Sequence, residues 1–329
     1  MAMRGWPLIK LLPTKTNFRF VAFARYAAVL SVVLVIASLV GVFKPGLALG
    51  IDFKGGASLE VAKPAGQVVE LNAVRAAVES LELGEVEVQG IARRDNNAQD
   101  GSTAVIRFQI PEGSNQTQVV QRVEAAISAS VGEVAYSGVE VVGSKVSGEL
   151  FSSGLWALGI AVLLMFLYIW FRFEPQFGFG AVAGLVHDVI LTFGLIVVMR
   201  LEFNLNMVAA ILTVIGYSMN DTVVVFDRLR ENLRKYKTMP LREVIDLSIN
   251  ETLSRTIITG MTAVMVLAAL AVYGGEALFG FSIALMFGII VGTYSSIYVG
   301  APIILLWGVK RGSLNEEAKP VKLGMASRP

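Results

Sequence analysis

Three ionisable side chains fall within apolar stretches of this sequence. Asp221 follows the apolar run that leads into Gly216-Tyr-Ser-Met-Asn-Asp, and His187 and Asp188 are neighbours near the middle of another run. His187 is the only histidine in the chain. An ionised Asp at the centre of a membrane-spanning helix costs about 2.5–3.5 kcal/mol on insertion scales, so such residues normally face a protein interior or a water-filled path. These residue types indicate proton transfer inside a membrane.

Further polar side chains recur at helical spacing around the first of these carboxylates. Thr213, Tyr217 and Asn220 share one predicted helical stripe with Asp221. We expect the stripe to hold a proton or water chain, and the alternative is a hydrogen-bonded contact that only fixes helix packing. Arg255 lies at the edge of a later apolar run, where its long side chain can either extend outward or pair with an intramembrane carboxylate.

The elements that must position these residues are six apolar runs. The chain has 329 residues, of which 54% are hydrophobic and 16% charged, compared with about a quarter charged in an ordinary soluble domain. A helix needs about 20 residues to cross the hydrocarbon core of a bilayer. We place the runs at Tyr26–Phe43, Leu150–Trp170, Phe177–Met199, Leu205–Phe226, Thr256–Tyr273 and Phe281–Trp307. The sequence therefore predicts a polytopic α-helical membrane protein with six transmembrane helices.

The charge distribution predicts the orientation. With the N-terminus inside, the inner segments hold 18 of the 28 Lys and Arg residues, whereas residues 44–149 hold nine basic and 14 acidic residues. Basic residues concentrate on the cytoplasmic side of membrane proteins, so both termini are expected there. The predicted order is a cytoplasmic N-terminal segment (1–25), a first helix (26–43), an extracytoplasmic domain (44–149), helices two to six (150–307) and a cytoplasmic tail (308–329).

The inserted segment, residues 44–149, changes from continuous apolar sequence to strand-like and helix-like patterns. The predicted order is strand (57–61), helix (69–81), two strands (86–92 and 104–110), helix (116–131) and strand (135–142). This is the split βαβ order of a ferredoxin-like α+β domain. The chain has no cysteine, so a hydrophobic core must hold this domain without disulfides.

Four short segments combine glycine, charged and hydroxyl residues in specific patterns. They are Gly50-Ile-Asp-Phe-Lys-Gly-Gly56, His187-Asp188, Gly216-Tyr-Ser-Met-Asn-Asp-Thr-Val-Val-Val-Phe-Asp-Arg-Leu-Arg-Glu-Asn232 and Ser254-Arg-Thr256. Together they resemble the SecD/SecF family of protein-export membrane proteins, and the resemblance covers nearly the whole chain. It marks as motif or structural positions Gly50, Asp52, Gly55, Gly56, Gly216, Tyr217, Asp227 and Arg228.

The resemblance implies roles for the intramembrane residues. It implies that Asp221 accepts the proton, that Arg255 is its charge partner, and that Asn220, His187 and Asp188 are polar neighbours in the same proton relay. It also implies half of an RND-type helix bundle. One residue departs from the family pattern. Gly260 stands where a serine is expected, so the resemblance implies no hydroxyl role at this position.

The resemblance further implies the cellular setting. It implies a multi-pass protein of the bacterial inner (plasma) membrane that pairs with SecD, binds near the SecYEG channel and associates with YajC and YidC. The proton-motive force would drive this protein to promote the export of preproteins. Protons would be the coupling ion, and no other cofactor, catalytic residue or nucleic-acid partner is expected.

Two other classes of function are alternatives. An RND-like, proton-coupled exporter of small molecules or lipids would use the same buried carboxylate, but this chain is half of a typical bundle of that type. An intramembrane serine hydrolase would need the Ser218 hydroxyl within hydrogen-bond reach of the His187 imidazole. No phosphate-binding G-x-x-x-x-G-K-[ST] motif occurs, and without cysteine and with one histidine a zinc site is not expected.

Overall fold

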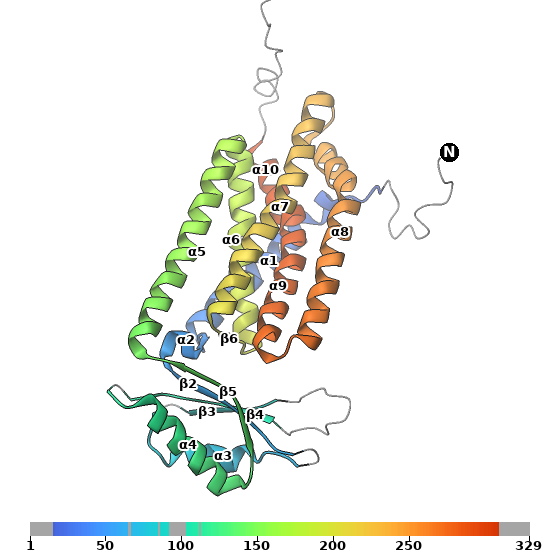
Figure 1. Ribbon diagram of the computed structural model, residues 1–329. Coiled ribbons are helices and arrows are strands. Elements are labelled where there is room, and N and C mark those ends of the chain that lie inside the picture. The colour runs from blue at the N-terminus through green and yellow to red at the C-terminus, as the bar shows by residue number, and fades with distance from the viewer. Residues whose placement is uncertain (1–15, 65–66, 85, 92–102, 112, 309–329) are drawn as a thin grey trace, which may run out of the picture. The chain divides into compact units, whose positions relative to one another are not determined.

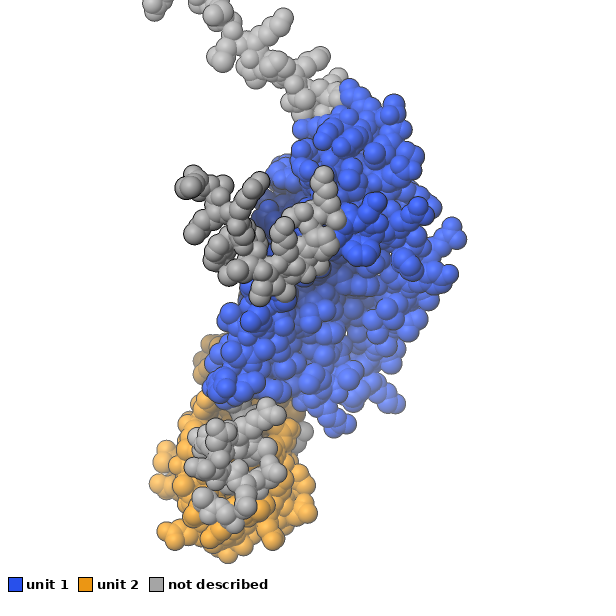
Figure 2. Space-filling model, turned by 90° about the vertical axis from the view of Figure 1, so that its right-hand side faces the viewer, with its two compact units in different colours: residues 1–47, 158–201, 206–329 blue, residues 48–157, 202–205 orange. Residues whose placement is uncertain are grey.

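A computed structural model describes residues 16–64, 67–84, 86–91, 103–111 and 113–308 of the chain (Figure 1). The predicted N-terminal segment (1–25) and tail (308–329) lie mostly outside the described residues. The chain divides into two compact units, coloured separately in Figure 2. Unit 1 comprises residues 1–47, 158–201 and 206–329, and unit 2 comprises residues 48–157 and 202–205.

Six helical stretches of the described residues are long and apolar enough to cross a membrane. They are α1 (Phe20–Phe43), α5 (Ser144–Arg172), α6 (Pro175–Val198), α7 (Leu205–Lys235), α8 (Leu241–Tyr273), and the continuous stretch of α9 (Glu276–Ser295), the π-helical turn η1 (Ser296–Gly300) and α10 (Ala301–Trp307). This confirms the expected six-helix fold. Several helices are longer than the apolar runs that predict them, since α7 continues to Lys235 and α8 already begins at Leu241.

Three helices form the interior of unit 1. In α6 and α7, 56% of the residues in the most apolar window are buried, and in the stretch from α9 to α10 the value is 50%, against 11% in α1 and in α5. Glycines allow the inner helices to approach closely: a Cβ atom added to Gly292 of α9 would lie 3.0 Å from Cβ of Ser218 on α7, and Gly288 faces Val214 in the same way. Small residues at such contacts are typical of membrane helix packing. Polar side chains on these inner faces are therefore enclosed by protein.

Unit 2 contains a four-stranded antiparallel sheet with the order β3-β4-β2-β5. Its elements are β2 (Gly56–Ala62), α3 (Leu71–Glu79), β3 (Val86–Ile91), β4 (Thr103–Phe108), α4 (Gln116–Val131) and β5 (Ala135–Val142). Both helices cover one face of the sheet (Figure 1), where alternate strand residues such as Leu59 and Ile106 are fully buried with Val123 and Ile127 of α4. The order and topology confirm the predicted ferredoxin-like domain.

Candidate functional site

Asp221 lies in α7 with only 3% of its surface exposed. Its carboxylate accepts one side-chain hydrogen bond, from the Thr293 hydroxyl of α9, with 3.2 Å between Oγ1 and Oδ2. A hydroxyl can donate to an ionised carboxylate and can also accept from a neutral one. Asp221 is therefore a buried acid whose hydrogen bond with the neighbouring helix is possible in either protonation state.

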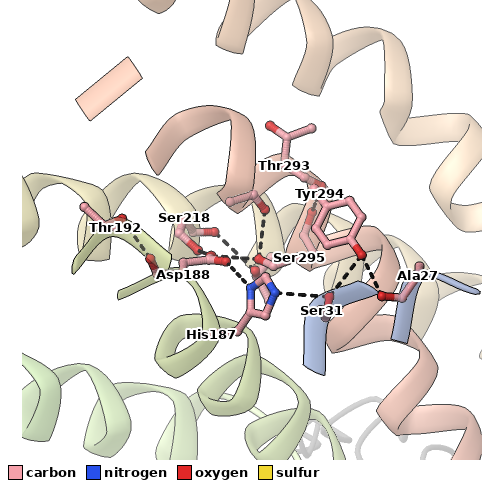
Figure 3. Close-up of polar contacts among 12 residues, drawn as sticks. Ala27, Ser31, His187, Asp188, Thr192, Ser218, Thr293, Tyr294 and Ser295 are labelled. Carbon is pink, nitrogen blue, oxygen red and sulfur yellow. Dashed lines mark hydrogen bonds and ion pairs between the residues drawn. The ribbon is translucent and has the colours of Figure 1, made fainter. Parts of the chain in front are cut away.

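A second buried carboxylate, Asp188 of α6, is the centre of a larger hydrogen-bond network (Figure 3). Asp188 is fully buried. Its Oδ2 accepts from Ser218 of α7 at 2.5 Å and from Ser295 of α9 at 2.7 Å, and its Oδ1 lies 2.9 Å from Nδ1 of the adjacent His187. The carboxylate therefore joins the three interior helices through side chains.

The other edge of the imidazole connects this network to α1. His187 Nε2 lies 3.1 Å from the hydroxyl of Ser31, which lies 3.0 Å from the hydroxyl of Tyr294. The Tyr294 hydroxyl donates to the backbone carbonyl of Ala27 at 2.9 Å, and its ring stacks beside the imidazole (Figure 3). Four helices, α1, α6, α7 and α9, thus contribute to one buried polar network.

The residues of the predicted polar stripe on α7 differ in their exposure. Asp221 is buried, but Thr213 and Asn220 are exposed in the isolated chain, and the Thr213 hydroxyl donates to the carbonyl of Ala209 in its own helix. Tyr217 is half-buried, and its hydroxyl has no hydrogen-bond partner among the described residues. Among the described residues, no hydrogen bond joins Thr213, Tyr217 or Asn220 to Asp221, so a proton or water chain along this stripe stays a prediction.

Arg255 lies in α8, and its side chain is exposed in the isolated chain. Among the ion pairs of the described residues, none within 4 Å joins Arg255 to Asp221. The structure therefore gives the predicted charge partner no direct contact with the acid. The Ser218 hydroxyl donates to Asp188 and not to His187, so the arrangement that a serine hydrolase needs is also not formed.

The predicted motif residues Asp227 and Arg228 lie in the C-terminal part of α7. Asp227 pairs with Arg172 of α5 at 3.0 Å, and Arg228 pairs with Glu251 of α8 at 2.7 Å and with Glu231 at 2.6 Å. These groups are partly exposed, and individual pairs of this kind contribute little stability. They connect α7 to two neighbours at the end where the apolar run stops.

The glycine-rich segment that follows α1 folds as β1 (Ala48–Leu49), a turn and α2 (Ile51–Lys54). The strand β1 pairs in parallel with β6 (Glu202–Phe203), which immediately precedes α7. Gly50 N–H donates to Phe203 O at 2.9 Å, and an added Cβ at Gly50 would collide with the Glu202 carboxylate. A side chain at position 50 would therefore have to displace the Glu202 carboxylate, because the two segments approach closely here.

The other predicted residues of this segment also have structural positions. The Asp52 carboxylate accepts the backbone N–H of Leu205, the first residue of α7, at 2.9 Å. Gly55 and Gly56 have φ values of 74° and 136°, which side-chain-bearing residues rarely adopt. A carboxylate at a helix N-terminus is favourable both as an acceptor and as a negative charge near the positive end of the helix dipole. The motif therefore caps the helix that carries Asp221.

A second contact within unit 2 reaches the same connection between α6 and α7. Arg107 of β4 forms an ion pair with Glu202 of β6 at 2.5 Å between Nη2 and Oε2. Burial raises the pKa of the Glu202 carboxyl above its ordinary value, and the neighbouring guanidinium partly offsets this effect. The ferredoxin-like sheet thus binds directly to the segment that leads into α7.

Sequence reasoning missed the hydroxyl groups that complete the network. Thr293, Tyr294, Ser295 and Ser296 form an unusual polar quartet inside the last apolar run, and this quartet is the signal that could have identified them. Three of these side chains bind Asp221, Asp188 or Ser31, and the fourth donates to its own helix. The π-helical turn η1 begins at Ser296, the last of the four, and such turns often occur at functional sites.

Among the described residues, no group of three or more His, Cys, Asp or Glu side chains is arranged to hold a metal ion. What the buried residues offer is two carboxylates, one imidazole and several hydroxyls. This donor set can bind and release protons or fix helices to one another.

Comparison with known proteins identifies relatives along nearly the whole chain. Residues 122–310 match the family "Protein export membrane protein SecD/SecF, C-terminal", and residues 40–62 match the "SecD/SecF GG Motif". The chain is 45% identical to protein translocase subunit SecF of Rhodobacter capsulatus over 319 residues, covering 94% of each chain. It is 44% identical to SecF of Cereibacter sphaeroides, covering 94% of this chain and 96% of that one.

The fold is similar to that of a solved structure of SecDF, a translocon-associated membrane protein, from Thermus thermophilus. The TM-score is 0.78 at 31% sequence identity, covering 90% of this chain. The chain spans 39% of the length of that SecDF chain. Its six apolar helices and these relatives make it a multi-pass membrane protein. The matched motifs, the extent of the identity and the shared architecture together show that the chain belongs to the SecD/SecF family of protein-export membrane proteins.

Proposed function

We propose that this chain is the SecF-like subunit of the Sec protein translocase and uses the proton-motive force, together with a SecD chain, to promote preprotein translocation. Its relatives are named as protein translocase subunits. The single observation that carries the proton-coupling part is Asp221, a carboxyl group that is 3% exposed inside an apolar helix bundle. The proposal assigns no catalysed reaction to the chain and no cofactor other than protons.

Protonation of Asp221 changes the energy of the bundle. Keeping an ionised Asp at the centre of a membrane helix costs about 2.5–3.5 kcal/mol, and one proton moving down 100 mV supplies about 2.3 kcal/mol. These two energies are similar, so a few protons suffice to shift the bundle between two packings. The contact through which the change is transmitted is the Thr293 hydroxyl, whose hydrogen bond to the carboxyl group weakens when the acid becomes neutral.

The proposed relay needs a second chain. Asn220 and Arg255 are exposed in the isolated chain, although an exposed polar group facing lipid is costly. We assign the covering surface to SecD, which would bring Arg255 and Asn220 into the proton path of Asp221. His187 and Asp188 are the polar neighbours on α6, where Asp188 binds α7 through Ser218.

The ferredoxin-like domain receives the movement through the start of α7. Asp52 caps the first N–H of that helix, and Arg107 binds Glu202 just before it. A shift of α7 along its axis would pull on both contacts. We therefore propose that residues 44–149 form an extracytoplasmic domain that moves against the emerging preprotein.

The setting of the chain follows from the same proposal. We place it in the bacterial inner membrane with both termini in the cytoplasm, beside the SecYEG channel, with YajC and YidC as further partners. The domain order is a cytoplasmic segment (1–25), the first helix (26–43), the outer domain (44–149), helices two to six (150–307) and a cytoplasmic tail (308–329).

The experiment that tests the function uses sealed membrane vesicles with an imposed proton gradient. Vesicles with and without this chain are compared for import of a labelled preprotein and for transport of a panel of small apolar molecules. We expect the chain to increase gradient-dependent preprotein transport and to leave the small molecules unaffected. The opposite pattern would support the RND-like exporter in place of a translocase subunit.

A further inference from the structure

The hydrogen-bond network around His187 has a direction that can be determined from its far end. The carbonyl oxygen of Ala27 can only accept, so the single proton of the Tyr294 hydroxyl is donated to it at 2.9 Å. The Tyr294 oxygen, 3.0 Å from the Ser31 hydroxyl, must then accept the Ser31 proton. With its own proton used, the Ser31 oxygen can only accept from His187 Nε2, which lies 3.1 Å away. His187 Nε2 therefore carries a hydrogen.

The opposite ring nitrogen faces a carboxylate that is already stabilised as an anion. Asp188 Oδ2 accepts hydrogen bonds from two hydroxyls, those of Ser218 and Ser295. Hydrogen bonds donated to a carboxylate favour its ionised form. Its remaining oxygen, Oδ1, lies 2.9 Å from His187 Nδ1, and because an ionised carboxylate can only accept, Nδ1 is then a donor as well. Both side chains are buried, with 6% and 0% exposed.

We infer that His187 is a doubly protonated imidazolium and forms, with Asp188, a permanently charged ion pair that positions Asp221 without carrying the transported proton. The titratable groups that face the imidazole are Asp188 and, across the stacked rings, Tyr294. The pair has no net charge. Buried charges are tolerated when each is paired with an opposite charge and all of their polar atoms are hydrogen-bonded.

The network is closed, which separates it from the proton path. On one side it ends at the Ala27 carbonyl, and on the other it ends at hydroxyls whose protons are donated to Asp188. Within the described part of the chain, no hydrogen bond connects these groups to Asp221. A proton could leave this network only by breaking it.

The ion pair nevertheless determines the surroundings of Asp221. Ser218 precedes Asp221 by one helical turn on α7, and Thr293 precedes Ser295 by two residues on α9. By binding Ser218 and Ser295 together, Asp188 fixes α7 against α9 at the level where Thr293 reaches Asp221. His187 and Asp188 are therefore positioning residues. This part of the inference rests on the proposed proton-coupling role of Asp221.

The charge of His187 can be measured directly, because it is the only histidine in the chain. The full-length protein, purified without a polyhistidine tag, is labelled with ¹⁵N-histidine and studied by solid-state NMR in lipid bilayers, alone and with SecD. The measurement is made about two pH units above the ordinary histidine pKa of about 6.5, where a free imidazole is about 99% neutral. We expect both ring nitrogens to be protonated, and an unprotonated nitrogen at either position would overturn the assignment.

Two variants separate a fixed positioning pair from a proton carrier. The Asp221→Asn variant should leave the His187 spectrum fully protonated, and a change in its charge would show that the two sites exchange protons. The Asp188→Asn variant should make His187 neutral. If that variant does not fold, the wild-type spectrum alone still decides the charge, and its result does not depend on any transport activity.

The positioning role is tested by the pH profile of gradient-driven export. In Asp188→Ala, no acceptor joins Ser218 to Ser295, so α9 is no longer held against α7 and Asp221 loses a hydrogen bond that favours its ionised form. The pH of half-maximal export should therefore move upward, and an unchanged profile would contradict the positioning role. If Asp221→Asn has no effect on export at all, the proposed function fails while the NMR result for the ion pair stands.

Discussion

The two hydroxyls that share one oxygen of Asp188 allow a quantitative test of the network. Ser218 and Ser295 both donate to Oδ2, at 2.5 and 2.7 Å. Replacing either serine by alanine leaves that oxygen with one partner. Replacing both leaves a fully buried carboxylate oxygen with none. The two substitutions should therefore be strongly non-additive.

The magnitude follows from this geometry. Hydrogen bonds between membrane helices contribute about 0.6 kcal/mol on average and up to about 1.7 kcal/mol, whereas loss of the last partner of a charged group costs about 1.5–3 kcal/mol. Each single variant, Ser218→Ala or Ser295→Ala, should lower the free energy of unfolding by about 0.6 kcal/mol. The double variant should lower it by about 2–3 kcal/mol, which leaves a coupling energy of about 1 kcal/mol or more.

The assay is reversible unfolding in lipid-detergent micelles titrated with SDS, followed by circular dichroism. Ser296→Ala is the matched control, because this neighbouring buried serine donates only to the carbonyl of Thr293 in its own helix stretch. It should show no coupling with either of the other substitutions. Additivity of Ser218→Ala and Ser295→Ala within about 0.5 kcal/mol, the range found for independent sites, would refute the shared-oxygen geometry.

Three further predictions concern the contacts around α7. Asp52→Ala should expose the first N–H of α7 and cost about 1 kcal/mol of stability, as for other lost caps. The check is hydrogen exchange of the Leu205 amide, which should become faster in Asp52→Ala and return close to the wild-type rate in Asp52→Asn. Unchanged exchange in Asp52→Ala would contradict the cap. Because the folded-state pKa of Glu202 is raised above its ordinary value of 4.5, its contribution to stability is fully present below pH 4.5 and is lost as pH rises through the higher folded-state pKa. As pH rises, the protection of the β6 amides from hydrogen exchange should therefore decrease in wild type and decrease less in Glu202→Gln. An identical pH dependence in the two proteins would show that Glu202 does not cause the loss of protection. Gly288→Ala should destabilise the bundle by about 1–3 kcal/mol, because the added Cβ would overlap Val214. Gly216→Ala is the control and should not destabilise it, because a Cβ added there meets no atom within 4 Å. Equal midpoints of SDS unfolding for the two variants would contradict the packing.

The fold could largely be predicted because its signals are compositional. Six long apolar runs and the alternating pattern between the first two sufficed for the helices and the ferredoxin-like order. The helix ends could not be predicted in the same way. The apolar runs end near Phe226 and begin again near Thr256, but backbone hydrogen bonding continues through amphipathic turns to Lys235 and from Leu241. The length of an apolar run indicates how much of a helix lies in the hydrocarbon core of the bilayer, and not where the helix begins and ends.

The site was predictable only at its charged residues. A carboxylate in an apolar run must be enclosed or hydrated, which identified Asp221 and Asp188. Hydroxyl groups carry no such signal, because a serine or threonine in a helix can donate to its own backbone, as Thr213 does, or to another helix, as Ser295 does. The partners of the carboxylates therefore depend on tertiary packing.

The hydrogen bond between His187 and Asp188 illustrates a further limit of sequence patterns. Adjacent residues on a helix point in different directions, so spacing alone argues against a contact between them. In the structure, the imidazole reaches the carboxylate of the next residue while its other nitrogen binds Ser31 of α1. Close packing of α1 against α6 makes this geometry possible, and no local pattern encodes it.

The most direct test of proton coupling is the rate of preprotein transport in vesicles that carry Asp221→Asn. The amide keeps the size of the side chain and its ability to accept from Thr293, but cannot gain or lose a proton in this range. Glu231→Gln, at the exposed end of the same helix with 62% of its side chain exposed, is the control. We predict that Asp221→Asn abolishes the stimulation of transport by an imposed proton gradient while transport without a gradient stays at the wild-type level. Gradient-stimulated transport at the wild-type rate in this variant would contradict the account.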